Sequence, residues 1–246
     1  MIEKFIEFEL KNNKLFPVFI YTFFISSTLA FLAIYFSISM YLLFILIALA
    51  IGYPITKFIE KSEAEEFIHK FNEKQLLKRH SRELLALWTI FGAFVLAFFV
   101  IFSFMPLNQV NTFQIGISGI EGDVAFLPNL LNNLGIFFLI FILCMISIAA
   151  IVFVIQWSAM LVAQSLVVIG DLVPTLISAL FILSSSLLLV GGYVLAGFAG
   201  VLLSLRFDIH ERTFKSKYMG QIQKDVFTLL GVGLLLVVVG VLLQLF

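Results

Sequence analysis

Long apolar runs separated by short charged segments dominate the chain. A helix that crosses a bilayer needs roughly 20 mainly apolar residues to span about 30 Å of hydrocarbon. Five runs meet this requirement, and we predict one spanning helix in each: residues 15–36, 38–55, 84–105, 134–157 and 226–246. This pattern predicts an all-α, polytopic membrane protein that forms a single helical domain over residues 1–246.

The stretch between residues 158 and 205 is harder to divide, because Asp171 is its only charged residue. As a helix, the part before Asp171 would rise about 20 Å, which is too short to cross, and the part after it about 50 Å, which is too long. We therefore predict two crossings, residues 158–182 and 184–205, with a broken helix near the serines at 184–186 or near Gly191 and Gly192. The predicted total is seven spans.

The basic residues predict the orientation of these spans. Lys and Arg occur only within residues 4–14, 57–82 and 206–224. The positive-inside rule places such segments on the cytoplasmic side. The loop at residues 106–133 contains Glu121 and Asp123 but no basic residue, so we expect it to be extracytoplasmic. We predict a multi-pass protein of the cell membrane with a cytoplasmic N-terminus.

Composition narrows the classes of function. Hydrophobic residues make up 62% of the chain. The formal net charge is zero, so no net electrostatic field favours the binding of nucleic acid. The single Cys144 excludes an intramolecular disulfide and a cysteine metal cage, and His69 and His80 lack the spacing of metal ligands. No His-Glu-x-x-His, P-loop or dinucleotide fingerprint occurs. We therefore expect no enzyme activity, no cofactor and no metal.

Residues 57–83 form the largest predicted element outside the membrane, a cytoplasmic amphipathic helix. Ser62 and Glu65 fit a capping box, which would start a helix at this point. The apolar edge of this helix suits either a partner or membrane surface, or packing against the bundle itself, and the second interpretation is favoured. The edge is made by Phe67, Ile68 and Phe71.

Small residues recur at every fourth position near the end of the sixth predicted span. The stripe consists of Gly192, Ala196, Gly200 and Ser204, and Gly197 widens it. Such stripes let helix backbones approach closely in a bilayer, where lipid provides no hydrophobic force for association. The contact could be internal or with another chain, and internal packing is favoured.

A second pattern places polar residues on one helix face inside the membrane. Trp157, Gln164 and Asp171 recur every seven residues, within about 20° per step if the helix is continuous. A carboxylate within a membrane segment is a hypothesis of function, such as a proton or cation relay. The favoured alternative is that Asp171 caps a helix that begins near Leu172, with Pro174 in its first turn.

Three local features stand out along the chain: Asn132 and Asn133 at the start of the fourth span, the step Trp157-Ser158-Ala159, and the segment GYVLAGFAGVLLS at residues 192–204. With these features and the order of its spans, nearly the whole chain resembles the stage II sporulation protein M family, in particular its archaeal branch. Many members carry a His-Gly-x-x-Glu element just before that segment, whereas Ser185, Ser186 and Leu189 stand there in this chain. In spore-forming bacteria the family member recruits peptidoglycan-remodelling partners at the division septum.

The resemblance implies an integral membrane scaffold or assembly subunit. The expected partners are the lipid bilayer and other membrane protein subunits, including a second copy of this chain. The alternative is a transporter or permease subunit, with a substrate path around broken helices near Asp171 and Gly191. Such breaks normally recur in both halves of a transporter, and the first three spans contain no counterpart. This favours the scaffold.

Overall fold

The protein is all-helical in the part that the computed structural model describes, which covers residues 15–35, 40–69, 80–104, 126–172, 176–210 and 216–244. The helices there are α2 (Leu15–Tyr35), α3 (Met40–His69), α5 (Ser81–Ser103), α7 (Phe126–Ile146), α8 (Ala150–Leu172), α9 (Leu176–His210) and α10 (Ser216–Leu243). Six of them contain a stretch long and apolar enough to cross a membrane, and α3 contains a shorter apolar part, Ile45–Ile59. The predicted class, a polytopic helical membrane protein, is confirmed.

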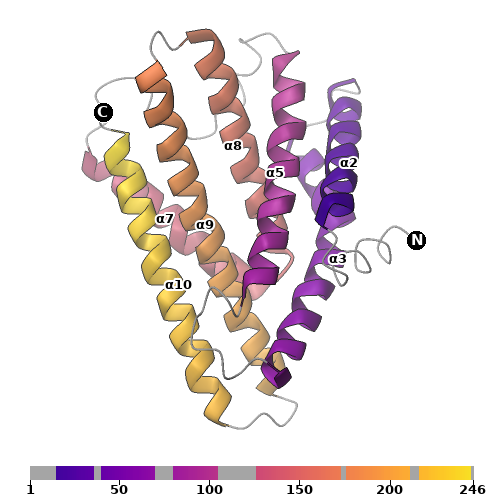
Figure 1. The fold of residues 1–246 in the computed structure, drawn as a ribbon, viewed down its shortest axis with the longest axis vertical. Coiled ribbons are helices and arrows are strands. Elements are labelled where there is room, and N and C mark those ends of the chain that lie inside the picture. Colours follow the sequence, from indigo (N-terminus) through magenta and orange to yellow (C-terminus); the bar gives the residue numbers. More distant parts are fainter. Residues whose placement is uncertain are drawn as a thin grey trace.

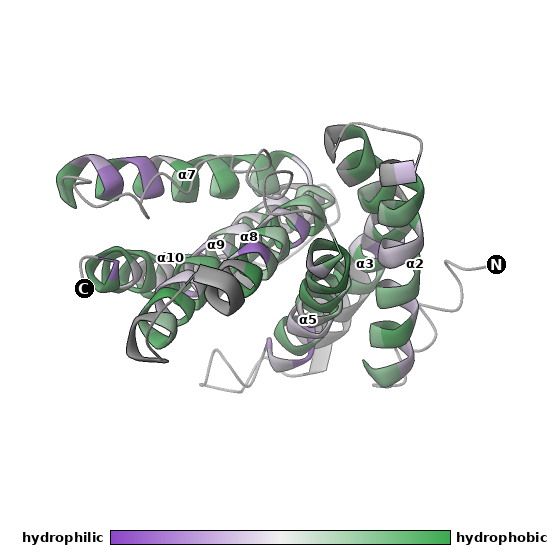
Figure 2. Ribbon diagram, turned by 90° about the horizontal axis from the view of Figure 1, so that it is seen from above, coloured by the Kyte–Doolittle hydropathy of each residue, from purple (hydrophilic) through white to green (hydrophobic). Residues whose placement is uncertain are grey.

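The helices alternate in direction along the bundle, except that α7 crosses it at a steep slant (Figure 1 and Figure 2). We call one end of the bundle the basic end. At this end α3 stops and α5 starts, and α9 stops and α10 starts. The connections at this end belong to the two Lys- and Arg-rich segments that follow residue 56. The described parts of the basic segments 57–82 and 206–224 therefore lie at one end of the bundle, as the charge pattern predicts.

α8 is the central helix. It packs against α3, α5, α7 and α9, and viewed from above it lies between α9 and α5 (Figure 2). It is buried on almost every side, which is typical of an apolar helix inside a bundle. The N-terminal half of the protein (α2, α3 and α5) and its C-terminal half (α7 to α10) meet mainly where α3 and α5 contact α8.

Aromatic packing dominates the N-terminal half. Phe94, Phe98 and Phe102 of α5 are fully buried, and their rings stack at centroid distances of 6.5 and 6.0 Å. The outside of the bundle carries large apolar side chains, as expected of a surface that faces lipid tails rather than water. Among the most exposed are Phe16, Phe24, Phe31, Ile146 and Phe227.

The predicted boundary between residues 157 and 158 is wrong. The break between the two helices lies at residues 147–149, so the predicted spans 134–157 and 158–182 correspond to α7 and α8 with shifted ends. The turn is closed by short i to i−3 bonds, such as Ala150 N–H to the Ser147 carbonyl at 3.0 Å. It contains neither Gly nor Pro, so no turn signal marks it in the sequence. α7 also starts at Phe126, inside the predicted loop 106–133.

The predicted break near Gly191 is also wrong. α9 continues for 35 residues through the serines at 184–186 and through Gly191 and Gly192. The Ser185 hydroxyl donates to the Ile182 carbonyl at 2.9 Å, so it is satisfied within its own helix. α9 is about 50 Å long, and its spanning part is Ala179–Ser204, so the helix extends beyond the hydrocarbon.

α3 likewise replaces two predicted elements. It runs from Met40 to His69 through Pro54, so it joins the predicted span 38–55 to the first part of the predicted cytoplasmic helix 57–83. The capping box at Ser62 therefore starts no helix. Residues 70–79 lie outside the described residues, and α5 begins at Ser81, before the predicted start at residue 84.

Candidate functional site

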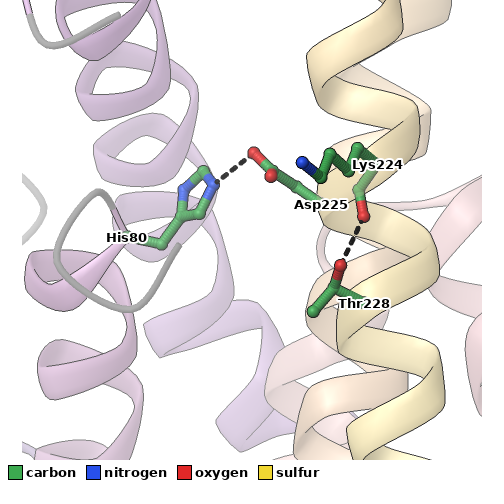
Figure 3. A network of polar contacts seen from close by, with 4 residues as sticks. All are labelled: His80, Lys224, Asp225 and Thr228. Carbon is green, nitrogen blue, oxygen red and sulfur yellow. Dashed lines mark hydrogen bonds and ion pairs between the residues drawn. The ribbon is translucent and has the colours of Figure 1, made fainter. Parts of the chain in front are cut away.

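A cluster of charged side chains is buried at the basic end. His80 occupies the N-cap position of α5, and Asp225 lies in the third turn of α10. The His80 Nε2 and Asp225 Oδ2 atoms are 3.4 Å apart (Figure 3). Only 3% of His80 and 5% of Asp225 is exposed. This contact joins the two halves of the protein through residues that are 145 positions apart.

Side chains from three helices make further contacts at this end of the bundle. The His80 ring meets the Phe198 ring of α9 edge-on at 5.5 Å, and Glu83, one turn into α5, is fully buried. The Arg82 guanidinium lies over the Phe58 ring of α3 at 5.2 Å. The cluster therefore combines hydrogen bonding and charge with aromatic packing, and it contacts α3, α5, α9 and α10.

Asp225 itself belongs to a regular stretch of α10. The Thr228 hydroxyl donates to the Lys224 carbonyl at 2.7 Å, and both of these side chains are exposed beside the buried carboxylate (Figure 3). Among the described residues, no group of three His, Cys, Asp or Glu side chains is suited to hold a metal ion. Sequence reasoning missed the cluster, because nothing local connects His80 to Asp225.

The predicted polar face lies on one unbroken helix, α8. Trp157 is half-buried and packs against the core, and Gln164 is 3% exposed. Asp171 lies in the last turn of α8, and its side chain is outside the described residues. Because α8 continues through Leu172 and α9 begins at Leu176, Asp171 does not precede the first turn of a helix. The capping interpretation is therefore wrong.

α8 also carries buried polar groups that have no hydrogen-bond partner among the described residues. Gln156 and Ser158 are 0% exposed and Gln164 is 3% exposed. Among the described residues, the side-chain nitrogen and oxygen atoms of these three make no hydrogen bond. An unpaired polar group in an apolar interior costs free energy, and within a membrane no bulk water is available to compensate. Such groups are rare in native proteins, and each one calls for an explanation.

The polar groups at the opposite end of the bundle satisfy one another. The Asn129 amide donates to the Gln244 side-chain oxygen at 2.8 Å, and the Asn133 amide donates to the Asn129 carbonyl at 2.8 Å. The Tyr193 hydroxyl donates to Oδ1 of Asn133 at 2.5 Å. This network joins α7, α9 and α10. Two of the segments on which the family resemblance rests, at Asn133 and at Tyr193, are therefore in direct contact.

The small-residue stripe of α9 packs inside the chain. A Cβ atom on Gly192 would lie 2.7 Å from the Gly233 carbonyl oxygen of α10. A Cβ on Gly200 would overlap the Phe141 carbonyl of α7 and lie 3.0 Å from the Cys144 Cβ. The other members also line these contacts: Ala196 and Gly197 are buried, and Ser204 is half-buried.

α10 supplies glycines to the same interface, and sequence reasoning missed them. A Cβ on Gly233 would lie 3.1 Å from the Gly192 carbonyl oxygen. A Cβ on Gly240 would lie 3.1 Å from the Ser185 carbonyl oxygen. The signal was present in the sequence, because these two glycines are seven residues apart and so share a helix face.

Comparisons with protein-family models, with curated proteins and with solved structures find no match to this chain. The inferences about function below therefore start from its own residues. Those residues form three groups: the charged cluster around His80 and Asp225, the unpaired groups of α8, and the network around Asn133.

Proposed function

We propose that the protein is a multi-pass assembly subunit of the cell membrane that holds partner proteins at its basic end. The observation that carries this proposal is the continuity of α3. The apolar part of this helix ends at Ile59, and the same helix continues for ten more residues to His69. That extension is about 15 Å long. Ile55, Phe58 and Ile59 are buried and fix its base in the bundle.

The extension, residues 60–69, is acidic. It contains four Glu and one Lys, so its formal charge is 1 − 4 = −3 with His69 neutral. The cytoplasmic leaflet carries a negative surface potential, which repels such a segment from the lipid headgroups. An acidic helical segment beyond the apolar part of α3 is therefore suited to a protein partner with a basic surface. The placement of the basic end in the cytoplasm, together with the N-terminus, is part of the proposal and follows from the positive-inside rule.

The C-terminal half supports a structural role. Backbone contacts at Gly192 and Gly200 hold α9 against α10 and α7, and the network around Asn133 joins the same three helices. The transporter alternative placed its substrate path at broken helices near Asp171 and Gly191. α9 is continuous at Gly191, so only the end of α8 at Asp171 is left of that path. A close-packed group of helices suits a subunit that presents fixed surfaces, as the resemblance to the stage II sporulation protein M family implies.

Crosslinking in native membranes tests the proposal. The tagged protein would be crosslinked, solubilised in mild detergent and captured, and its partners would be identified by mass spectrometry. In the test variant the four glutamates of residues 60–69 are replaced by Gln. The matched control replaces Glu121 by Gln and Asp123 by Asn, in the predicted loop at the opposite end.

We expect specific partners that are lost in the test variant and retained in the control. The two variants must reach the membrane at equal levels for the comparison to hold. Recovery of the same partners from both variants would contradict the role of the α3 extension. Absence of any specific partner from crosslinked wild-type membranes would contradict the assembly function itself.

A further inference from the structure

The two unpaired amides of α8 belong to one buried stripe. Gln156, Met160 and Gln164 are four residues apart, so they lie one above the other on the same helix face. Their exposed fractions are 0%, 2% and 3%. The carboxamides of Gln156 and Gln164 make no hydrogen bond to any described residue. The stripe therefore places two unpaired amides in the membrane interior, with a flexible thioether side chain between them.

The stripe faces the junction between the two halves of the protein. A Cβ on Gly197 of α9 would lie 3.5 Å from Ile151, which marks the side of α8 that faces α9. At about 100° per residue, Gln156 and Gln164 lie about 140° from Ile151 in opposite directions around α8. Both are therefore turned away from α9, toward the side where α3 and α5 pack. Val152, one turn before Gln156, is the α8 residue nearest to Gly52 of α3.

Apart from Glu83, the buried side chains of α5 offer these amides no polar group. After Glu83, every buried residue of α5 is Leu, Ile, Ala or Phe. The Thr89 hydroxyl donates to the Leu85 carbonyl within its own helix. An interface that serves only for packing would have apolar side chains on α8 as well, because each unpaired amide destabilises the interface. The amides therefore indicate a ligand that enters between the halves.

We propose that the stripe of Gln156, Met160 and Gln164 is a binding site for a small uncharged solute that both donates and accepts hydrogen bonds, such as a polyol. A carboxamide offers two N–H donors and one carbonyl acceptor, so it matches that chemistry. The unbranched Met160 side chain adapts its shape to different occupants. Gln156, Met160, Gln164 and the buried residues of α5 after Glu83 carry no charge, and an ion placed beside them would remain uncompensated in a low dielectric.

The spacing of the amides decides whether one solute molecule can contact both of them. Gln156 and Gln164 are separated by about 12 Å along the helix axis. A molecule of polyol size does not bridge that distance, so the two amides act as successive binding positions along α8. The site is closed in this structure, and the solute reaches it when α3 and α5 move relative to α8. This inference does not depend on the assembly role, because it concerns the membrane interior and not the basic end.

Cysteine labelling in membranes tests the site. Gln156→Cys and Gln164→Cys would each be made in a Cys144→Ser background. The matched control is Val162→Cys, because Val162 is equally buried in α8, at 3% exposure, but lies about 20° from Ile151 on the side that faces α9. Labelling needs water at the thiol, because the thiolate is the reactive form. The probes are the uncharged methyl methanethiosulfonate and its charged trimethylammonium-ethyl and sulfonatoethyl analogues.

We expect the uncharged reagent to label the Gln156→Cys and Gln164→Cys variants at least tenfold faster than the control, and glycerol to slow labelling at these two positions only. The charged reagents should label all three positions slowly. Equal rates for the uncharged reagent at all three positions would overturn the site. Fast labelling by the charged reagents would overturn the assignment to an uncharged solute.

A second measurement keeps the proposal testable if a cysteine variant misfolds. Substituting both amides by Leu removes only unpaired groups, so the Gln156→Leu/Gln164→Leu variant should fold and be at least as thermally stable as the wild type. Glycerol stabilises most proteins by exclusion from their surface, and specific binding adds to that effect. Glycerol should therefore raise the Tm of the wild type more than the Tm of the double variant. An equal gain in both proteins would refute binding at the stripe.

Discussion

The contact between Gly192 and Gly233 leads to a prediction in which one substitution has opposite effects at two glycines. In Gly192→Ala, the new Cβ would lie 2.6 Å from a Val237 methyl and 2.7 Å from the Gly233 carbonyl oxygen. The methyl can rotate away, but the carbonyl belongs to the backbone of α10. In Gly231→Ala, the new Cβ meets nothing within 4 Å.

The expected magnitudes follow from these distances. A carbon and a carbonyl oxygen in contact are separated by roughly 3.3 Å, so α9 and α10 must move apart by about 0.6 Å at Gly192. Overpacking of this kind costs about 1–3 kcal/mol, and Ala recovers up to about 1 kcal/mol of helix propensity. With that gain subtracted, Gly192→Ala should destabilise the protein by up to about 2 kcal/mol, whereas Gly231→Ala should stabilise it by up to about 1 kcal/mol.

Thermal unfolding in mild detergent measures both effects. The single Cys144 is fully buried, so a thiol-reactive fluorogenic dye reports its exposure as the bundle opens. One kcal/mol shifts Tm by roughly 2–4 °C for a chain of this size. Gly192→Ala should therefore lower Tm by several degrees, and Gly231→Ala should raise it slightly. A Gly192→Ala protein as stable as the wild type would refute close backbone packing between α9 and α10.

The remaining predictions address the polar groups and the topology. His80→Ala and Asp225→Asn should each destabilise the protein by about 1–3 kcal/mol, and their effects should be non-additive in a double-mutant cycle; additive losses would show that the pair does not interact. Tyr193→Phe should cost about 1 kcal/mol in thermal stability, because it removes a buried hydrogen bond, and an unchanged Tm would count against the network. Asp171→Asn should leave stability unchanged or raise it by a few tenths of a kcal/mol, because a negative charge is unfavourable in the last turn of a helix; a clear loss would indicate a binding partner for the carboxylate. A cysteine at position 121, in a Cys144→Ser background, should react with an impermeant reagent only from outside the cell, and labelling from the cytoplasmic side alone would reverse the topology.

The membrane character of the protein and most of its helices follow from the sequence alone. The free energy of moving a segment from water into lipid is nearly a sum over its residues, so 62% apolar composition and the lengths of the runs predict the fold class directly. α2 matches the predicted span 15–36 within one residue, because charged or polar residues border that run. The small-residue stripe through Gly192 and Gly200 is also visible in the sequence, since its period of four is a property of one helix.

The tertiary structure alone decided where helices stop inside apolar segments and which residues meet. Transfer free energy does not distinguish a turn from a helix within an apolar run, so the break at residues 147–149 left no signal. The continuity of α9 through Gly191 depends on α10, whose backbone packs against the glycines that would otherwise weaken the helix. The approach of His80 to Asp225 and the lack of partners for Gln156 depend on the order and rotation of neighbouring helices. Those are set by packing between segments far apart in the chain, which no local pattern records.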